Sequence, residues 1–193
     1  MGLGYRTGIV LVGRGSHSGK MIGVFSHAHK DVLYDTLKRE DINWRVFNLQ
    51  VAKQVYEQHS LEKSRTQVLV LDESIKTRRG KKIEAVSSHF DHVSNTHVMG
   101  QQVLTLGLAT DEAFVPLDSQ IFVSKKKVHT LIKPYSDGRS VGAKRYQEAI
   151  GQTKVEMAAG MMRRAVRAGI QADYVAADAW FGNKECKRPR SNV

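Results

Sequence analysis

Two aspartates in this 193-residue chain each come at the end of a segment typical of a β-strand. Asp72 follows the continuous apolar run 68–71, a pattern typical of a strand buried on both faces. Asp178 ends the strand-like segment 172–178, ADYVAAD. If the two strands are parallel neighbours, their backbones lie about 4.8 Å apart, and two carboxylates that close repel one another.

Such a pair has two stable states. Either one carboxyl group takes up a proton, or divalent cations neutralise both groups. Mg²⁺ prefers one or two carboxylates together with water and phosphate oxygens, and two metal ions can clamp the attacking and leaving oxygens of a phosphodiester. Asp72 and Asp178 are therefore the candidate catalytic and metal-binding residues, with Mg²⁺ or Mn²⁺ as cofactor. A single aspartate at a strand end is more often a turn residue, so the hypothesis depends on both.

The elements that must position this pair follow the order β-β-β-α-β from residue 66 onward. After the strand ending at Asp72, residues 101–109 and 113–124 predict two further strands. Residues 143–169 predict one long helix with a core-facing apolar stripe. Because a strand–helix–strand connection crosses over right-handed, its two strands become parallel and their carboxyl ends meet at one edge. The fold class predicted is therefore α/β, with a mixed sheet.

Two helices are predicted before this core. Residues 26–40 follow a Ser26 cap, and residues 41–58 follow an Asp41 cap. The two helices are either a DNA-reading pair or a packing subdomain, and the lack of recognisable base-reading residues favours packing. The expected organisation is a flexible leader at 1–25, a helical region at 26–64, a partial core at 65–183 and an aberrant basic tail at 184–193.

The chain carries a formal net charge of +11, from 30 Lys and Arg against 19 Asp and Glu. Such an excess favours nucleic acid or an anionic membrane as a partner. No stretch approaches the roughly eighteen uninterrupted apolar residues of a membrane span, and the N-terminus lacks a signal-peptide core. We therefore expect a cytoplasmic location and no membrane partner. Cys186 is the only cysteine, so the core and not a disulfide must hold the fold.

The basic residues gather in two segments that predict loops. In that setting they are either solvated or in contact with DNA phosphates, and phosphate contacts position DNA without reading its sequence. The net charge favours DNA. The candidate DNA-binding residues are Lys76, Arg78, Arg79, Lys81, Lys82, Lys125, Lys126 and Lys127.

Two other groups of residues have competing interpretations. A zinc site requires three or four well-placed ligands, so the histidine-rich segment 89–97 is expected to bond locally or to face DNA. Trp180 and Phe181 are expected to be core residues at the end of the sheet, with base stacking as the alternative.

Three segments together resemble the DDE-type transposases of bacterial insertion sequences, most closely insertion-sequence family four. They are GKKIEAVSSHFDHVSNTHVMG at 80–100, LTLGLATDEAFVPLD at 104–118 and DAWFG at 178–182. The resemblance implies a ribonuclease H-like fold, metal-dependent DNA strand cleavage and strand transfer, and transposon ends and target DNA as partners. The first catalytic aspartate of that family begins an Asp-x-Thr/Ser motif, which maps to Asp72-Glu73-Ser74, and the second maps to Asp178.

Two departures from the family pattern bear on the site. Glu73 stands where relatives often have a second aspartate, so Asp72 is chosen as the ligand because it follows the apolar run directly. The third acid of the family is a glutamate on a helix beyond the second aspartate, and this sequence ends before such a residue. The resemblance therefore implies a C-terminally truncated transposase with an incomplete sheet.

Three functional hypotheses remain at this point. The first is the truncated and inactive transposase fragment. The second is a non-catalytic DNA-binding remnant that forms dimers with, or inhibits, a full-length enzyme. The third is a compact nuclease unrelated to transposition, in which Glu84 or Glu156 supplies the third ligand. The sequence does not decide whether the chain forms a homodimer.

Overall fold

The computed structural model describes residues 30–78, 83, 85–91, 94–123 and 137–182. The chain divides into two compact units, Met1–Asp41 and Ile42–Val193. In the first, the described residues contain helix α2 (Lys30–Leu37). After it, the Arg39 guanidinium donates to both carboxylate oxygens of Asp41, at 3.0 and 2.5 Å, and this contact lowers the pKa of Asp41. The expected division into 1–25, 26–64, 65–183 and 184–193 stays a prediction.

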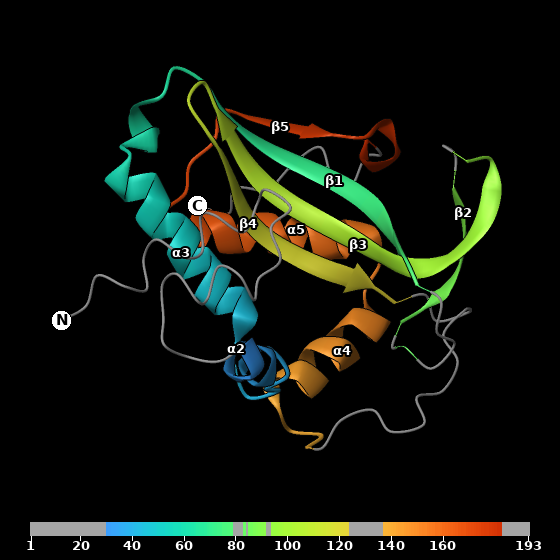
Figure 1. The fold of residues 1–193 in the computed structure, drawn as a ribbon. Coiled ribbons are helices and arrows are strands. Elements are labelled where there is room, and N and C mark those ends of the chain that lie inside the picture. Colours follow the sequence, from blue (N-terminus) through green and yellow to red (C-terminus); the bar gives the residue numbers. More distant parts are fainter. Residues whose placement is uncertain (1–29, 79–82, 84, 92–93, 124–136, 183–193) are drawn as a thin grey trace. The chain divides into compact units, whose positions relative to one another are not determined.

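The second unit combines helices with a mixed sheet (Figure 1). Within the described residues its elements are α3 (Trp44–Gln58), the 3-10 helix η2 (Leu61–Lys63), β1 (Gln67–Thr77), β2 (Ser87–Asp91), β3 (Thr96–Thr110), β4 (Phe114–Phe122), α4 (Val141–Gly151), α5 (Lys154–Arg167), β5 (Tyr174–Ala177) and the 3-10 helix η3 (Ala179–Phe181). None of the helices in this described part of the chain is both long and apolar enough to cross a membrane.

Strand β3 is the centre of the sheet. It pairs antiparallel with β1 from Gln67↔Thr110 to Thr77↔Gly100. On its other side it pairs with β2 along its first five residues and with β4 along its second half. Strand β5 pairs in parallel with β1 and is the outermost strand on that side among the described residues. The sheet is therefore mixed, as predicted.

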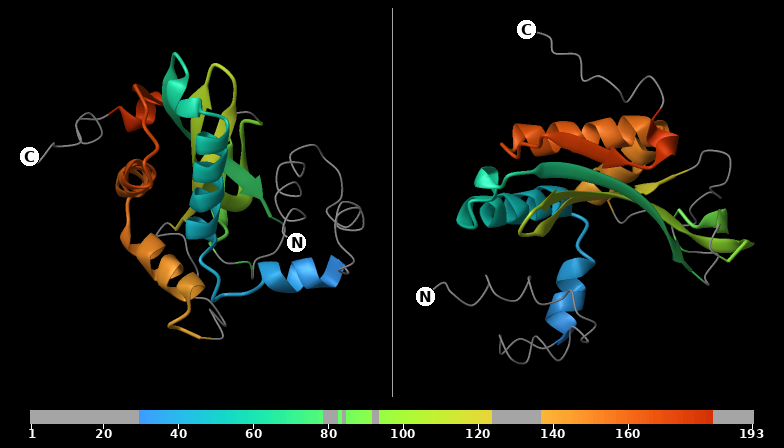
Figure 2. Two further views of the ribbon diagram at one scale, coloured as in Figure 1. Left: turned by 90° about the vertical axis from the view of Figure 1, so that its left-hand side faces the viewer. Right: turned by 90° about the horizontal axis from the view of Figure 1, so that it is seen from above.

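Side-chain alternation gives the sheet two different faces. The helix face carries Leu69 and Leu71 of β1 and Leu104, Leu106 and Leu108 of β3, all 4% exposed or less. Helix α5 contacts β3 and β4 and runs behind the sheet in Figure 1, as Figure 2 also shows from above. We call the opposite side the open face; β1 contributes Val68, Val70, Asp72 and Ser74 to it, and none of these is buried.

Three local features differ from the sequence-based expectations. Strand β1 continues through Asp72 to Thr77, so Asp72 lies within a strand and not at its end. The N-cap of α3 is Asn43, whose side chain accepts from Val46 N, and the Asp41 carboxylate is bonded to Arg39.

The expected helix 143–169 is two helices. Gln152 is extended, and Thr153 starts α5 with a capping box in which its hydroxyl and the Glu156 carboxylate exchange bonds with each other's backbone N–H. The box gives hydrogen-bond partners to backbone N–H groups at the start of α5, which in an unbroken helix would bond to carbonyls of the preceding turn. The break between α4 and α5 is therefore stable.

A buried charge cluster anchors the three long helices on β4. The Asp118 carboxylate, 5% exposed, accepts two hydrogen bonds from Arg164 of α5, at 2.9 and 2.6 Å. Arg45 of α3 lies 3.9 Å from the other Asp118 oxygen and 3.3 Å from Glu148 of α4. Arg145 of α4 donates a hydrogen bond to the Ser119 carbonyl. The pKa of Arg145 is lowered, mainly by burial and secondly by the positive charge of Arg45. Asp118 is therefore the carboxylate around which α3 and α5 are oriented.

Replacing Asp118 with asparagine should lower the free energy of unfolding by about 3 kcal/mol, because it leaves Arg45 and Arg164 half-buried without their shared counter-charge. The measurement is chemical denaturation followed by circular dichroism. Asp137→Asn is the matched control, since Asp137 is 60% exposed and pairs with Arg139 at the surface. It should change stability by less than about 0.5 kcal/mol. Equal effects of the two substitutions would contradict the anchoring role.

Candidate active site

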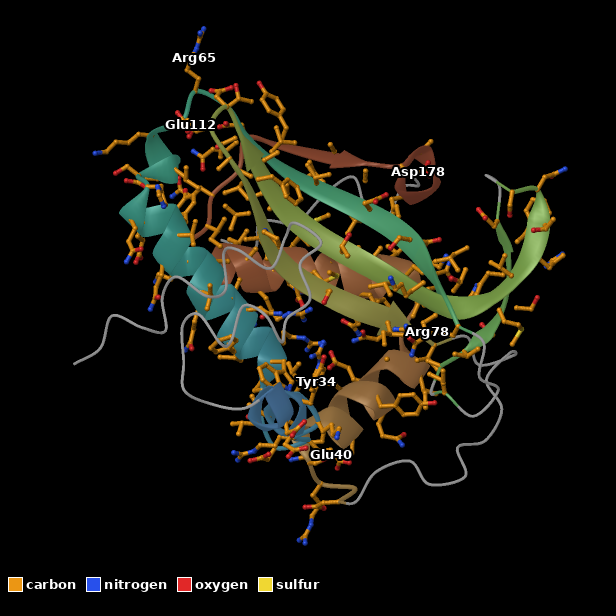
Figure 3. All side chains as sticks on the ribbon, in the orientation of Figure 1. Tyr34, Glu40, Arg65, Arg78, Glu112 and Asp178 are labelled. Atoms are coloured by element: carbon orange, nitrogen blue, oxygen red, sulfur yellow. The ribbon has the colours of Figure 1, made fainter. Side chains whose placement is uncertain are left out.

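The register between β1 and β5 brings the two predicted aspartates together in the sheet. The parallel pairing runs from Val68↔Tyr174 to Leu71↔Ala177, and Asp72 and Asp178 are the next residues of the two chains. Cross-strand partners point to the same face of a sheet. Continuing the register by one residue therefore sets Asp72 opposite Asp178 on the open face. Figure 3 shows Asp178 directly beyond the end of β5.

The backbone around each aspartate is well defined. The Asp72 carbonyl accepts a 3.3 Å hydrogen bond from the Thr105 hydroxyl of β3, in addition to the ladder between these strands. The Asp178 carbonyl accepts from Phe181 N at 2.9 Å and so starts η3. Both aspartates are exposed, while Phe181 is 3% exposed and fixes the turn in the core. The carboxylates are thus presented to solvent from a rigid backbone.

Glu73, the alternative first ligand, lies on the helix face. Its carboxylate forms an ion pair with Lys154 Nζ at 2.7 Å and accepts a short hydrogen bond from the Gln102 amide. Lys154 also lies over the Phe122 ring, 5.2 Å from its centroid. Adjacent residues of a strand point to opposite faces, so Glu73 cannot share the Asp72–Asp178 side without disturbing β1. This arrangement favours Asp72 as the ligand.

Two polar contacts determine how β5 pairs with β1. At the start of the strands, Gln67 N donates to the Asp173 carboxylate at 2.9 Å and Asp173 N donates to the Gln67 carbonyl at 2.8 Å. At the other end, Lys154, the first residue of α5, holds Glu73. Helix α5 leads directly to β5. The Gln67–Asp173 contacts hold the start of β5 against β1, and the Lys154–Glu73 ion pair holds the start of α5 against β1.

The donor set fits a hard divalent cation in part. Carboxylate oxygens are its preferred ligands, and Mg²⁺ commonly uses one or two of them and keeps several waters. Among the residues that the structure describes, no group of three or more His, Cys, Asp or Glu gathers as a metal site. Glu156 is engaged in the capping box, where its carboxylate accepts from Thr153 N at 2.7 Å, and Glu84 lies outside the described residues.

The structure describes several of the other candidate residues. His89 is buried and shares a 2.8 Å hydrogen bond with Ser87, so it bonds locally as expected. Lys76 and Arg78 are exposed near the far end of β1, and Arg78 Nε donates to Gln101. Phe181 is a core residue as expected. Candidates outside the described residues are His92, Arg79, Lys81, Lys82, Lys125, Lys126 and Lys127, together with the side chain of Trp180.

Sequence reasoning missed the strand β2 and its pairing with β3. The two strands form a hairpin whose turn includes Asn95 in the left-handed conformation, with φ of 52°. Asn in that conformation is a common hairpin signal, and Ser94-Asn95 between two polar–apolar alternating segments could have indicated it.

The fold and site together define an α/β protein with a carboxylate pair at neighbouring parallel strands. A family model described as DDE superfamily endonuclease matches residues 5–186. The chain therefore belongs to this family, whose members cleave DNA and typically use divalent metal ions. Comparison with curated proteins gave no match, and comparison with solved structures gave none.

Mn²⁺ or Mg²⁺ should raise the melting temperature of the protein, and Asp72→Asn and Asp178→Asn should each remove most of that increase. The reason is that either substitution removes one of two charges that attract the ion. The measurement is differential scanning fluorimetry against metal concentration.

Two controls separate metal binding from general damage. Asp111→Asn, in the exposed turn between β3 and β4, should leave the metal effect unchanged. Glu73→Gln should lower the melting temperature without metal, because it removes the ion pair with Lys154, but should keep most of the metal-induced increase. An increase that depends on Glu73 and not on Asp72 would reverse the ligand assignment.

Proposed function

We propose that this chain derives from a DNA transposase of an insertion sequence, related to insertion-sequence family four, with Asp72 and Asp178 as its first two catalytic acids. The observation that carries the proposal is the parallel β1–β5 register, which extends to set the two aspartates opposite one another. Membership of the DDE superfamily endonucleases supplies the reaction class. DNA is the substrate, and the transposon ends and target DNA are the specific partners proposed.

We also propose that the sheet is of the ribonuclease H-like type. Three long strands, β1, β3 and β4, are antiparallel neighbours that follow one another in sequence apart from the short β2. The chain then crosses over through α4 and α5 to β5, which is parallel to β1. An acid on the first strand and another after the last strand is the arrangement expected from the resemblance.

In this proposal the two aspartates hold Mg²⁺ or Mn²⁺ against the open face, where DNA has access to them. Bound there, such an ion would supply Lewis-acid stabilisation to phosphodiester oxygens and to an attacking water. Thr105 and the β1–β3 ladder fix the backbone of Asp72, and η3 fixes that of Asp178. Lys154 keeps Glu73 turned to the helix face, so that only one acid of the Asp72-Glu73 dipeptide faces the DNA.

The fragment is proposed to be deficient in strand transfer. Within the described residues no third carboxylate joins the pair, and Glu156 is occupied by its capping box. A third acid normally fixes the second ion, and a misplacement of reacting groups by about 1 Å can cost a hundredfold in rate. The second candidate function, a cytoplasmic DNA-binding remnant that pairs with or inhibits a full-length enzyme, follows from the same deficiency together with the charge of +11.

The purified chain with Mg²⁺ or Mn²⁺ should bind DNA that carries the ends of its element but should not join those ends to a target efficiently. The measurement is a strand-transfer assay resolved on a denaturing gel. Any residual nicking should disappear in Asp72→Asn and Asp178→Asn variants and should persist in Asp111→Asn. Efficient joining that disappears in the two aspartate variants would show that the chain completes its own active site, and would contradict the proposed deficiency.

Binding to DNA should weaken steeply as salt increases, because cations that contact phosphates release counterions. Each neutralised phosphate contributes about −0.9 to the slope of log K against log salt concentration. Lys76→Gln and Arg78→Gln should each reduce the slope by about that amount in fluorescence anisotropy titrations. Lys53→Gln is the control, since Lys53 is 47% exposed on α3 and pairs with Glu57. Affinity that does not respond to salt would contradict the DNA-binding proposal.

A further inference from the structure

The open face does not end at the acid pair but continues along β1 and β3. Asp72, Ser74 and Lys76 alternate on this face, opposite Thr105, Val103 and Gln101 of β3. Beyond the last pair of the ladder, Arg78 N donates to the Met99 carbonyl at 2.8 Å. Two basic side chains therefore follow the first aspartate on the same face, and Figure 3 shows Arg78 where β1 ends.

The hairpin of β2 and β3 extends this face beyond the rest of the sheet. Ser88 pairs with Met99, and Phe90 pairs with His97, so these four side chains share one side of the hairpin. That side is exposed, with Phe90 at 40% and Met99 at 43%. On the other side Ser87 and His89 are buried. Figure 1 shows the hairpin projecting past the ends of β4 and β5.

Gly100 makes the junction between the sheet and the hairpin. It pairs with Thr77 of β1 on one side and with Ser87 of β2 on the other. A Cβ atom at this position would lie 2.8 Å from the Lys76 carbonyl oxygen, so a larger residue would push the strands apart. The close approach keeps Lys76 and the hairpin in one continuous surface.

The exposed side of the hairpin has the chemistry of a base-stacking surface. The Phe90 and His97 rings form an edge-to-face pair with centroids 5.3 Å apart, and the Ser88 hydroxyl lies 3.5 Å from His97 Nδ1. Aromatic faces stack on any base, and flanking cations hold the backbone between the bases. A purely apolar partner would not use Lys76 and Arg78, and the backbone of Arg78 is bonded to Met99 of this hairpin side.

We propose that this hairpin side, formed by Ser88, Phe90, His97 and Met99, binds unpaired bases of the DNA strand whose phosphates Lys76 and Arg78 contact. The inference rests on the proposed function, because it takes DNA as the substrate. Arg78 lies six positions beyond Asp72, which is about 20 Å at 3.3 Å per residue. Bases of a stacked strand are about 3.4 Å apart, so the hairpin engages the strand about six nucleotides or more from the acid pair.

The test compares two phenylalanines in similar settings. Phe90 and Phe47 are both 40% exposed, and each forms an edge-to-face pair, Phe47 with Trp44 of α3 at 5.9 Å. Phe90→Ala and Phe47→Ala are made in the Asp72→Asn background, with EDTA present, so that cleavage does not enter the measurement. The probes are a forked duplex with unpaired ends and a blunt duplex of the same sequence, both titrated by fluorescence anisotropy.

Phe90→Ala should weaken binding to the forked duplex about tenfold and to the blunt duplex less than threefold, with no change in the salt slope. Phe47→Ala should change both affinities less than twofold. Equal effects of the two variants, or an equal loss for forked and blunt DNA after Phe90→Ala, would overturn the stacking proposal. A reduced salt slope in Phe90→Ala would also overturn it, because the loss would then be electrostatic.

Failure of this inference is distinct from failure of the proposed function. The binding assay contains no metal and uses a variant without Asp72, so a missing nuclease activity cannot produce a negative result. Conversely, a metal-induced increase in melting temperature that survives both Asp72→Asn and Asp178→Asn, with a fork preference that depends on Phe90, would refute the assignment of the two aspartates and retain the hairpin as a DNA-binding surface. Circular dichroism melts of both phenylalanine variants establish that the fold is intact.

Discussion

The parallel pairing of β5 with β1 is the constraint on which the site depends. Strand β5 is short, and all four of its residues are exposed, so burial contributes little to its position. Its register relies on the backbone pairs with β1 and on the two-way contact between Gln67 and Asp173. At the far end the ion pair of Lys154 with Glu73 secures the start of α5. A shift of one residue would turn Asp178 away from Asp72, because successive side chains of a strand point to opposite faces.

The two faces of the sheet differ in burial and in charge, and adjacent residues of β1 point to different faces. Leu69 and Leu71 fill the core, and Glu73 continues the same row with a charge that Lys154 and Gln102 compensate. Asp72 and Lys76 belong to the other row and face solvent. Stability is thus concentrated on the helix face. The open face carries acids, cations and the aromatic side of the hairpin.

The cluster around Asp118 shows how several arginine side chains are accommodated beside the core. Arg45, Arg145 and Arg164 approach two carboxylates, Asp118 and Glu148, from three helices. Burial and the neighbouring cations lower the pKa of Arg145, but an arginine stays charged at neutral pH, so the cluster keeps a surplus of positive charge. Removing one partner of a buried ion pair lowers the free energy of unfolding by more than the intact pair contributes to it. Stability is therefore sensitive to substitution of Asp118, although this residue is not part of the open face.

The sequence by itself determined the strands around residues 68–71, 101–109, 113–124 and 172–178, the helical connection between the last two, and the pair of aspartates that neighbouring parallel strands would bring together. These follow from apolar periodicity and from the handedness of strand–helix–strand connections, which are local or nearly universal. The roles of Asp72 and Asp178 in catalysis remain a prediction.

Only the tertiary structure decided that β1 passes through Asp72, that Glu73 turns to Lys154, that Thr153 divides the long helix and that β2 forms a hairpin with β3. Each depends on partners distant in sequence or on a choice between two similar local states. Glu73 and Lys154, for example, are 81 positions apart in numbering, and no local pattern identifies such a pair. The sequence favoured Asp72 over Glu73 only through its place directly after the apolar run, and the sheet then put the two side chains on opposite faces.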